Sequence, residues 1–221
     1  MAEYTSLLHS NVTLRILTGV ICGPIVIALI VLSWWTTAIL IVAALVLATL
    51  EYIQLVQHEP SSTRNDILFG LCYLGTPLIA ALWLRGQDDG EKWFLVMLIA
   101  NWVTDSAAYF TGRFVGKTPF VPTISPKKTW EGVIGGLVGG CILTIIAASI
   151  VGLDIGVAVI FIGIFVPIAT VLGDLLESKL KRHFNVKDSG HILPGHGGIL
   201  DRIDGTLMAL PTAAIIVALL V

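Results

Sequence analysis

Charged residues are scarce in this sequence. Asp, Glu, Lys and Arg make up 13% of the 221 residues, whereas hydrophobic residues make up 56% and the mean hydropathy is +0.91. Soluble domains carry about 25% charged residues. The scarcity therefore excludes an ordinary soluble domain and indicates a membrane protein.

Cysteine is also scarce. Cys22, Cys72 and Cys141 lie inside apolar runs, and their spacing fits no metal site. We expect them to be buried, reduced side chains that behave as small hydrophobic residues.

What the sequence has in abundance is long apolar runs. A helix needs about 20 apolar residues to cross a bilayer, and backbone polar groups cannot stay unpaired in lipid, so each run is predicted to be a helix. The first run lacks a basic leader and a cleavage site, which favours a membrane helix over a signal peptide. We predict an all-α polytopic membrane protein with about seven transmembrane helices, at 14–33, 36–56, 66–85, 92–112, 133–152, 156–178 and 202–221. Without repeats or linkers, the chain is predicted to be one transmembrane catalytic domain, 1–221, whose site-bearing half is 92–221.

Two long loops, Arg113–Gly132 and Lys179–Asp201, carry most of the basic residues. If both face the cytoplasm, eleven of the 13 Lys and Arg residues lie inside, and only Arg85 and Lys92 lie outside. Short loops rich in Lys and Arg stay in the cytoplasm. We therefore expect an integral protein of the cytoplasmic (inner) membrane, with its N-terminus, both long loops and its active site on the cytoplasmic face.

The stretch from Ser178 to Asp204, SKLKRHFNVKDSGHILPGHGGILDRID, holds five of the 13 Lys and Arg residues and three of the five His. Carboxylates suit a divalent metal, Lys and Arg suit phosphates, and Gly lets the backbone come close to a ligand. A solvated, positive-inside loop would explain Lys179, Lys181 and Arg182. It would not explain the segment from His196 to Asp204 at the mouth of a membrane helix.

Three segments of this stretch, Ser178–Arg182, Lys187–Gly190 and Pro194–Asp204, resemble the signature of phosphatidate cytidylyltransferases (CDP-diacylglycerol synthases), with no departure across the 27 residues. The resemblance implies a nucleotidyltransferase that converts CTP and phosphatidic acid to CDP-diacylglycerol and pyrophosphate in phospholipid synthesis. It implies CTP, phosphatidic acid and membrane lipid as partners and no nucleic acid, and it leaves a homodimer open.

Carboxylates near two helix ends dominate the predicted catalytic set. Asp174 and Glu177 are spaced i, i+3 on one helix face, as are Asp201 and Asp204 on another. Hard oxygen ligands on separate rigid elements suit Mg²⁺. The resemblance implies that Asp174 and Asp201 bind the catalytic Mg²⁺, with a second cation left open. The predicted catalytic residues are Asp174, Lys187, Asp188, Asp201, Arg202 and Asp204.

Two further segments are predicted to bind substrate. The segment Ser125–Thr129 offers two ammonium and two hydroxyl groups, with Pro126 stiffening a turn, although such a cluster can simply meet anionic lipid. Asp105 is an ionisable residue inside a span and belongs either to a polar cavity or to a packing hydrogen bond. Glu51 ends the second span similarly, and its alternative is a place at the membrane interface. The predicted substrate-binding residues are Asp105, Ser125, Lys127, Lys128, Thr129, His196, Gly197 and Gly198.

Rival interpretations are weaker. A CTP-dependent lipid kinase or an archaeal-type CDP-lipid synthase would share the carboxylates, but the string from His196 to Asp204 argues against both. A transporter would explain the spans and Asp105, yet it predicts two related halves that the sequence does not have. A zinc site at His183, His191 and His196 lacks a cysteine or an i, i+4 pair. The glycines between Gly132 and Gly140 are predicted to serve close helix packing.

Overall fold

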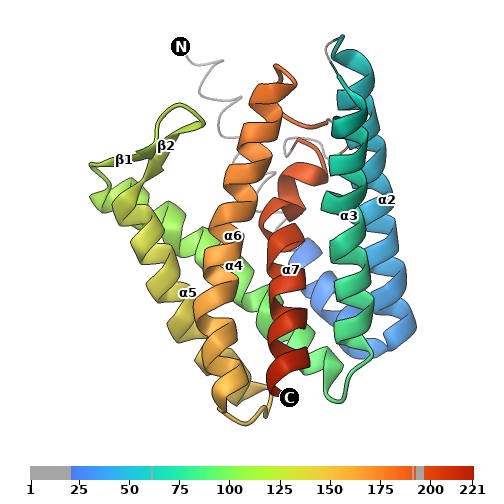
Figure 1. Ribbon diagram of the computed structural model, residues 1–221. Coiled ribbons are helices and arrows are strands. Elements are labelled where there is room, and N and C mark those ends of the chain that lie inside the picture. The colour runs from blue at the N-terminus through green and yellow to red at the C-terminus, as the bar shows by residue number, and fades with distance from the viewer. Residues whose placement is uncertain (1–20, 61, 191, 193–196) are drawn as a thin grey trace.

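The structure is a computed structural model that describes residues 21–60, 62–190, 192 and 197–221 (Figure 1). A short apolar helix, Ile21–Leu32, comes first among them. The elements that follow are α2 (Trp34–His58), α3 (Arg64–Arg85), α4 (Gly90–Val115), β1 (Pro119–Val121), β2 (Ser125–Thr129), α5 (Trp130–Ile150), α6 (Val157–His183) and α7 (Leu200–Leu220). Six helices of the described part are long and apolar enough to cross a membrane, so this is an all-α polytopic membrane protein with one small hairpin.

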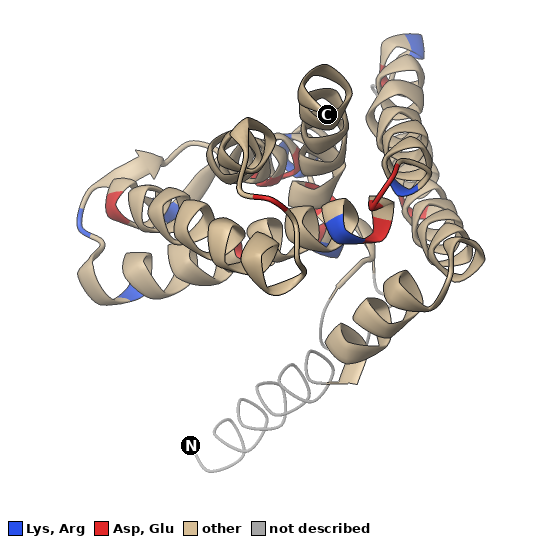
Figure 2. Ribbon diagram, turned by 90° about the horizontal axis from the view of Figure 1, so that it is seen from below, with Lys and Arg blue, Asp and Glu red and all other residues tan. Residues whose placement is uncertain are grey.

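The helices form two neighbouring groups. In the first, α5 and α6 form an antiparallel hairpin, α7 lies beside α6, and α4 runs obliquely behind them (Figure 1). In the second, α2 and α3 form another hairpin, which contacts the first group mainly where α3 packs against α7. Most of the ribbon carries no charged residue when the bundle is seen from below (Figure 2).

Three connections lie at one end of this bundle. They are the β1–β2 hairpin, the α2–α3 connection and the described part of the α6–α7 connection (Figure 1). The two long loops that were predicted to share one face of the membrane therefore share one end of the molecule.

Most predicted helix positions agree with the structure. Six spans are confirmed to within a few residues, namely 36–56, 66–85, 92–112, 133–152, 156–178 and 202–221. The span 14–33 is helical over Ile21–Leu32, and residues 14–20 lie outside the described residues.

The end of α6 differs from the prediction. The helix continues to His183, so the loop expected to begin at Lys179 begins five residues later. Lys181, Arg182 and His183 form its last turn, where cations interact favourably with the negative end of the helix dipole. The extension turns Lys181 from an expected loop residue into a helical one.

The glycines of α5 serve helix packing, as predicted. A Cβ atom at Gly132 would lie 2.9 Å from the carbonyl oxygen of Ala108 in α4. One at Gly136 would lie 2.9 Å from both the Cβ of Ala108 and the carbonyl oxygen of Thr104. Since a real side chain does not fit at these distances, the small residues set how closely α4 and α5 approach.

The expectation that all three cysteines are buried was wrong. Cys22 and Cys72 are free and exposed on the outside of their helices, and Cys141 is partly exposed. In a membrane protein the outer surface faces lipid rather than water, so a small apolar side chain is stable there without burial in protein.

Replacing Gly136 with Ala should destabilise the protein by about 1–3 kcal/mol, because the added methyl group forces α4 and α5 apart. Thermal unfolding of the purified protein in detergent measures this as a lower midpoint. The control is Gly75→Ala, because a Cβ at Gly75 meets nothing within 4 Å. Equal midpoints for the two variants would refute the packing role of Gly136.

Candidate active site

The β1–β2 hairpin presents the basic segment toward the helices. Ser125–Thr129 was predicted to form a turn but forms strand β2, which pairs antiparallel with β1. Pro126 has no backbone N–H to donate. It is tolerated because both strands of a two-stranded ribbon are edge strands, where an N–H on the outer side needs no partner in the sheet. Glu131, at the start of α5, accepts hydrogen bonds from the backbone N–H groups of Lys117 and Thr118 at 3.1–3.2 Å. These bonds anchor the base of the hairpin to α5.

Lys128 joins this hairpin to α6. Its Nζ lies 2.5 Å from Oδ2 of Asp174, and the two side chains keep 21% and 32% of their surface exposed. The ion pair is therefore accessible from solvent, and a charged ligand can compete for either partner.

Lys181 joins α6 to α7. Its Nζ lies 2.5 Å from Oε2 of Glu177 on the same helix and donates a hydrogen bond to Oδ1 of Asp201 at 2.9 Å. The side chains of Glu177 and Asp201 are only 1% and 6% exposed. Taking carboxylates out of water is costly unless a cation pairs with them. Lys181 supplies that cation between the last turns of α6 and the first turn of α7.

Asp201 also organises the loop between these helices. Its Oδ2 accepts hydrogen bonds from the backbone N–H of Gly198 at 2.8 Å and from that of Ser189 at 3.0 Å. Gly197 has a φ of 81°, a conformation that favours glycine, and a Cβ there would lie 2.9 Å from Oδ2 of Asp201. The carboxylate thus ties two separate parts of the loop to the start of α7.

A buried amide fixes three helices beneath the charged residues. Asn101 of α4 donates a hydrogen bond from Nδ2 to Thr206 of α7 at 3.2 Å, and its Oδ1 accepts one from Thr170 of α6 at 2.9 Å. Nearby, a Cβ at Gly173 of α6 would lie 2.5 Å from the carbonyl oxygen of Asp204 in α7. The backbones of α6 and α7 are therefore in close contact at Gly173 and Asp204, next to Asp174.

These contacts enclose a charged pocket of about 490 Å³ between α4, β2, α5, α6 and α7. Its charged lining residues are Asp105, Arg113, Lys127, Lys128, Asp174, Asp201, Arg202 and Asp204. Four carboxylates and four cations thus face one space at one end of the bundle. Such a lining can hold phosphates through its cations and a divalent metal through its carboxylates.

The pocket gathers most of the predicted site residues. Asp105 lines it from α4, and its side chain is exposed there rather than buried in a helix contact. The others that line it are Lys127, Lys128, Thr129, Asp174, Asp201, Arg202 and Asp204.

The remaining predicted residues lie elsewhere. Ser125, Lys187, Asp188, Gly197 and Gly198 are not among the residues that line the pocket. Lys187 and Asp188 are exposed in the α6–α7 loop, whereas Gly197 and Gly198 lie against the carboxylate of Asp201. His196 lies outside the described residues.

Several residues of the site were not predicted. Arg113 and Tyr109 line the pocket from α4, joined by a hydrogen bond of 3.0 Å from Arg113 to the Tyr109 hydroxyl. Their i, i+4 spacing on a helix that also carries Asp105 was the available signal. Glu51 contacts the backbone of Leu200, and Lys181 contacts Asp201, and no local spacing indicates either of these long-range contacts.

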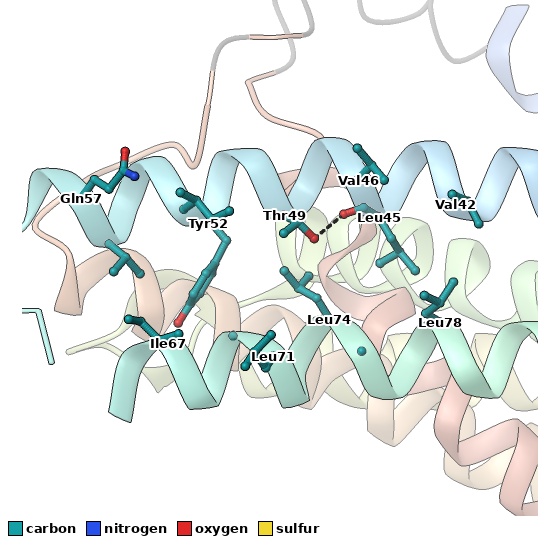
Figure 3. Close-up of a pocket in the computed structure, with 14 residues that line it drawn as sticks. Val42, Leu45, Val46, Thr49, Tyr52, Gln57, Ile67, Leu71, Leu74 and Leu78 are labelled. Carbon is teal, nitrogen blue, oxygen red and sulfur yellow. Dashed lines mark hydrogen bonds between the residues drawn. The ribbon is translucent and has the colours of Figure 1, made fainter. Parts of the chain in front are cut away.

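A second pocket contrasts with this one. It is an apolar groove of about 450 Å³ between α2 and α3, lined mainly by Val, Leu and Ile side chains (Figure 3). Two of its polar side chains are already paired, since Thr49 donates to the carbonyl oxygen of Leu45 at 2.6 Å and Tyr52 to that of Asp66 at 2.7 Å. The groove has no charged lining residue, so it lacks the cations and carboxylates that hold a nucleotide's phosphates and metal.

Fold and pocket together define a polytopic helical membrane protein with a phosphate- and metal-compatible pocket at one end of its bundle. A family model described as the cytidylyltransferase family matches residues 60–220. The chain belongs to the cytidylyltransferase family.

Relatives with established names are similar over the same region. A phosphatidate cytidylyltransferase of Thermotoga maritima is 46% identical over 140 residues, which cover 61% of this chain and 52% of that protein. One of Mycobacterium bovis is 45% identical over 134 residues, covering 60% and 44%. One of Bacillus subtilis is 40% identical over 179 residues, covering 79% and 66%. The matched region thus spans about half the length of the first two relatives.

Replacing Lys181 with Met should destabilise the protein by about 3–5 kcal/mol, because two buried carboxylates lose their shared cation. Lys181→Arg keeps the charge and should retain more stability. Lys179→Met is the matched control, since Lys179 is exposed on the same helix. Thermal unfolding in detergent measures all three, and identical midpoints for Lys181→Met and Lys179→Met would contradict the pairing.

Proposed function

We propose that this protein transfers the cytidylyl group of CTP to phosphatidate, forming CDP-diacylglycerol and releasing pyrophosphate. The observation that carries the proposal is the single pocket in which carboxylates from α4, α6 and α7 face Lys127, Lys128 and Arg202. Family membership supports the same reaction class, and the relatives' names supply the lipid substrate.

The reaction needs little covalent chemistry from the protein. A phosphate oxygen of phosphatidate bonds to the α-phosphorus of CTP, the bond from that phosphorus to the bridging oxygen breaks, and pyrophosphate leaves with the electron pair. The attacking phosphate is already anionic at neutral pH, so no Ser, Cys or His nucleophile is required. Catalysis then consists mainly of positioning and charge neutralisation.

The cations of the pocket would hold the phosphates. Lys127 is exposed on β2, and Lys128 has a partly exposed ion pair with Asp174 that a substrate phosphate can replace. Arg202, in the first turn of α7, lines the same pocket from a different element. The acyl chains would remain in lipid while the phosphate reaches this pocket at the end of the bundle.

The donor set fits Mg²⁺. Asp105, Asp174, Asp201 and Asp204 offer hard oxygen ligands, and Mg²⁺ binds proteins through one or two carboxylates while phosphates and water complete its shell. Among the described residues, no group of three or more His, Cys, Asp or Glu side chains is arranged to hold a metal ion. When bound, Mg²⁺ would neutralise charge on the phosphates.

The two predicted metal ligands differ in how many hydrogen bonds and ion pairs already occupy their carboxylate oxygens. Asp174 has one oxygen paired with Lys128, and its other lies 3.4 Å from the Ser178 hydroxyl. Asp201 accepts hydrogen bonds from Lys181, Ser189 and Gly198, so it must release a donor before it can bind a cation. We therefore propose Asp174 as the more accessible ligand of the two.

The protein would lie in the inner membrane with its site facing the cytoplasm, where CTP is found. A homodimer stays a prediction. The charge distribution supports this orientation, since eleven of the 13 Lys and Arg residues then lie inside.

Asp174→Asn should lower the rate of phosphatidate-dependent pyrophosphate release from CTP by about 100-fold or more, because it removes charge from the pocket while keeping the side chain's shape. Purified parent and variant are compared at saturating Mg²⁺, with Asp154→Asn in the α5–α6 connection as the control. Near-normal turnover of Asp174→Asn would refute its role, and a parent without pyrophosphate release would refute the function.

Replacing both Lys127 and Lys128 with Ala should raise KM for CTP or phosphatidate, because two phosphate-binding cations are lost. The assay is performed in neutral detergent, where a role limited to contacts with anionic lipid disappears. Equal kinetic constants for variant and parent would then assign these lysines to lipid contact.

Orientation can be tested with a cysteine at Ser125 in a background without native cysteines. A membrane-impermeant maleimide should not label it in intact cells but should label it after the membrane is opened. A cysteine at Asp88, in the exposed turn between α3 and α4, should label in intact cells. The reverse pattern would contradict the proposed orientation.

A further inference from the structure

Glu51, on α2, is a buried carboxylate that reaches the start of α7. Its side chain is 1% exposed. Oε1 accepts a hydrogen bond from the backbone N–H of Ile199 at 3.0 Å, and Oε2 accepts one from that of Leu200 at 2.8 Å. Both oxygens thus bind the N-terminus of a helix that lies almost 150 positions later in the sequence.

The first turn of α7 has no N-cap side chain of its own. Its N-cap position is occupied by Ile199, which has no side chain that can accept a hydrogen bond. The first N–H groups of a helix have no partner within the helix, and leaving them unpaired inside a protein is costly. Glu51 supplies the missing acceptors, and its negative charge is favourable at the positive end of the helix dipole.

Two glycines of the α6–α7 loop lie so close to this carboxylate that a side chain would not fit. A Cβ at Gly190 would lie 2.4 Å from Oε1 of Glu51, and one at Gly198 would lie 2.5 Å from Oε2. Neither glycine has a positive φ, so close neighbours rather than backbone conformation explain why a side chain is absent there. The neighbour is Glu51 at Gly190, and Glu51 together with the Ser189 hydroxyl at Gly198. The loop therefore wraps Glu51 on two sides.

We propose that Glu51 is a positioning residue for the reaction. By fixing Ile199 and Leu200 it sets the direction of the first turn of α7, which carries Asp201, Arg202 and Asp204 into the charged pocket. Asp201 also accepts hydrogen bonds from Gly198 and Ser189, so Glu51 and Asp201 both hold the segment that leads into α7. The expected loss of activity rests on the proposed function, whereas the expected loosening of the start of α7 does not.

The test begins with Glu51→Gln in the full-length protein. The amide keeps the shape but offers one acceptor oxygen, so an N–H of Ile199 or Leu200 loses its partner. Amide hydrogen exchange should become faster in peptides that contain these two residues and stay unchanged in α5. The kcat should fall about 10- to 100-fold, as for other residues that orient catalytic groups indirectly. KM for CTP should change less than kcat, because two of the three proposed phosphate-binding cations, Lys127 and Lys128, belong to a different element.

Gly190→Ala provides a second variant that leaves Glu51 itself intact. Its methyl group should push against Oε1 of Glu51 and give the same faster exchange at Ile199 and Leu200. Gly75→Ala, where the methyl group meets nothing within 4 Å, is the matched control. Asp88→Asn is the control for loss of a carboxylate, since Asp88 is exposed between α3 and α4.

Unchanged exchange at Ile199 and Leu200 in Glu51→Gln would overturn the inference, as would faster exchange with an unchanged kcat per folded molecule. Gly190→Ala behaving as Gly75→Ala would also count against it. A parent protein without CTP-dependent pyrophosphate release refutes the proposed function instead, and the exchange measurement then still decides whether Glu51 holds α7.

Discussion

The pairing of Lys181 with Glu177 and Asp201 is the interaction on which the site depends. Two carboxylates that are almost fully removed from water would repel each other and lose hydration without a shared cation. With Lys181 between them, the last turns of α6 and the first turn of α7 are held together. Asp174 and Asp204 enter the pocket from these same two helices, so the pairing fixes where their charges lie.

Support for this arrangement comes from residues that do not themselves line the pocket. Asn101 of α4 links α6 and α7 below the pocket, and Glu51 of α2 caps α7 beside it. Helices packed in lipid gain little from the hydrophobic effect, so polar contacts and close small-residue packing define their relative positions. The glycines of α5 and the carboxylate of Glu51 illustrate the two kinds of contact.

The sequence predicts the helices well because a span must be long and apolar to cross lipid. It also predicts the pocket residues Asp201, Arg202 and Asp204, which belong to one dense motif, and Asp174, which lies four residues before that motif at the end of a span. What it does not predict is long-range pairing. Glu51 meets Leu200 across 149 positions, and no local spacing indicates that contact. The strand at Ser125–Thr129 was also missed, because a basic segment with a proline has the composition of a turn.

The proposed transfer predicts which phosphate of CTP reaches the lipid. Purified protein is incubated with phosphatidate, Mg²⁺ and CTP that carries radioactive phosphorus at either the α or the γ position, and the lipid is extracted. Cytidylyl transfer predicts that α-label appears in the lipid while γ-label is released as water-soluble pyrophosphate. Label from the γ position in the lipid would instead identify a CTP-dependent lipid kinase, and label from neither position would contradict phosphoryl chemistry on this lipid altogether.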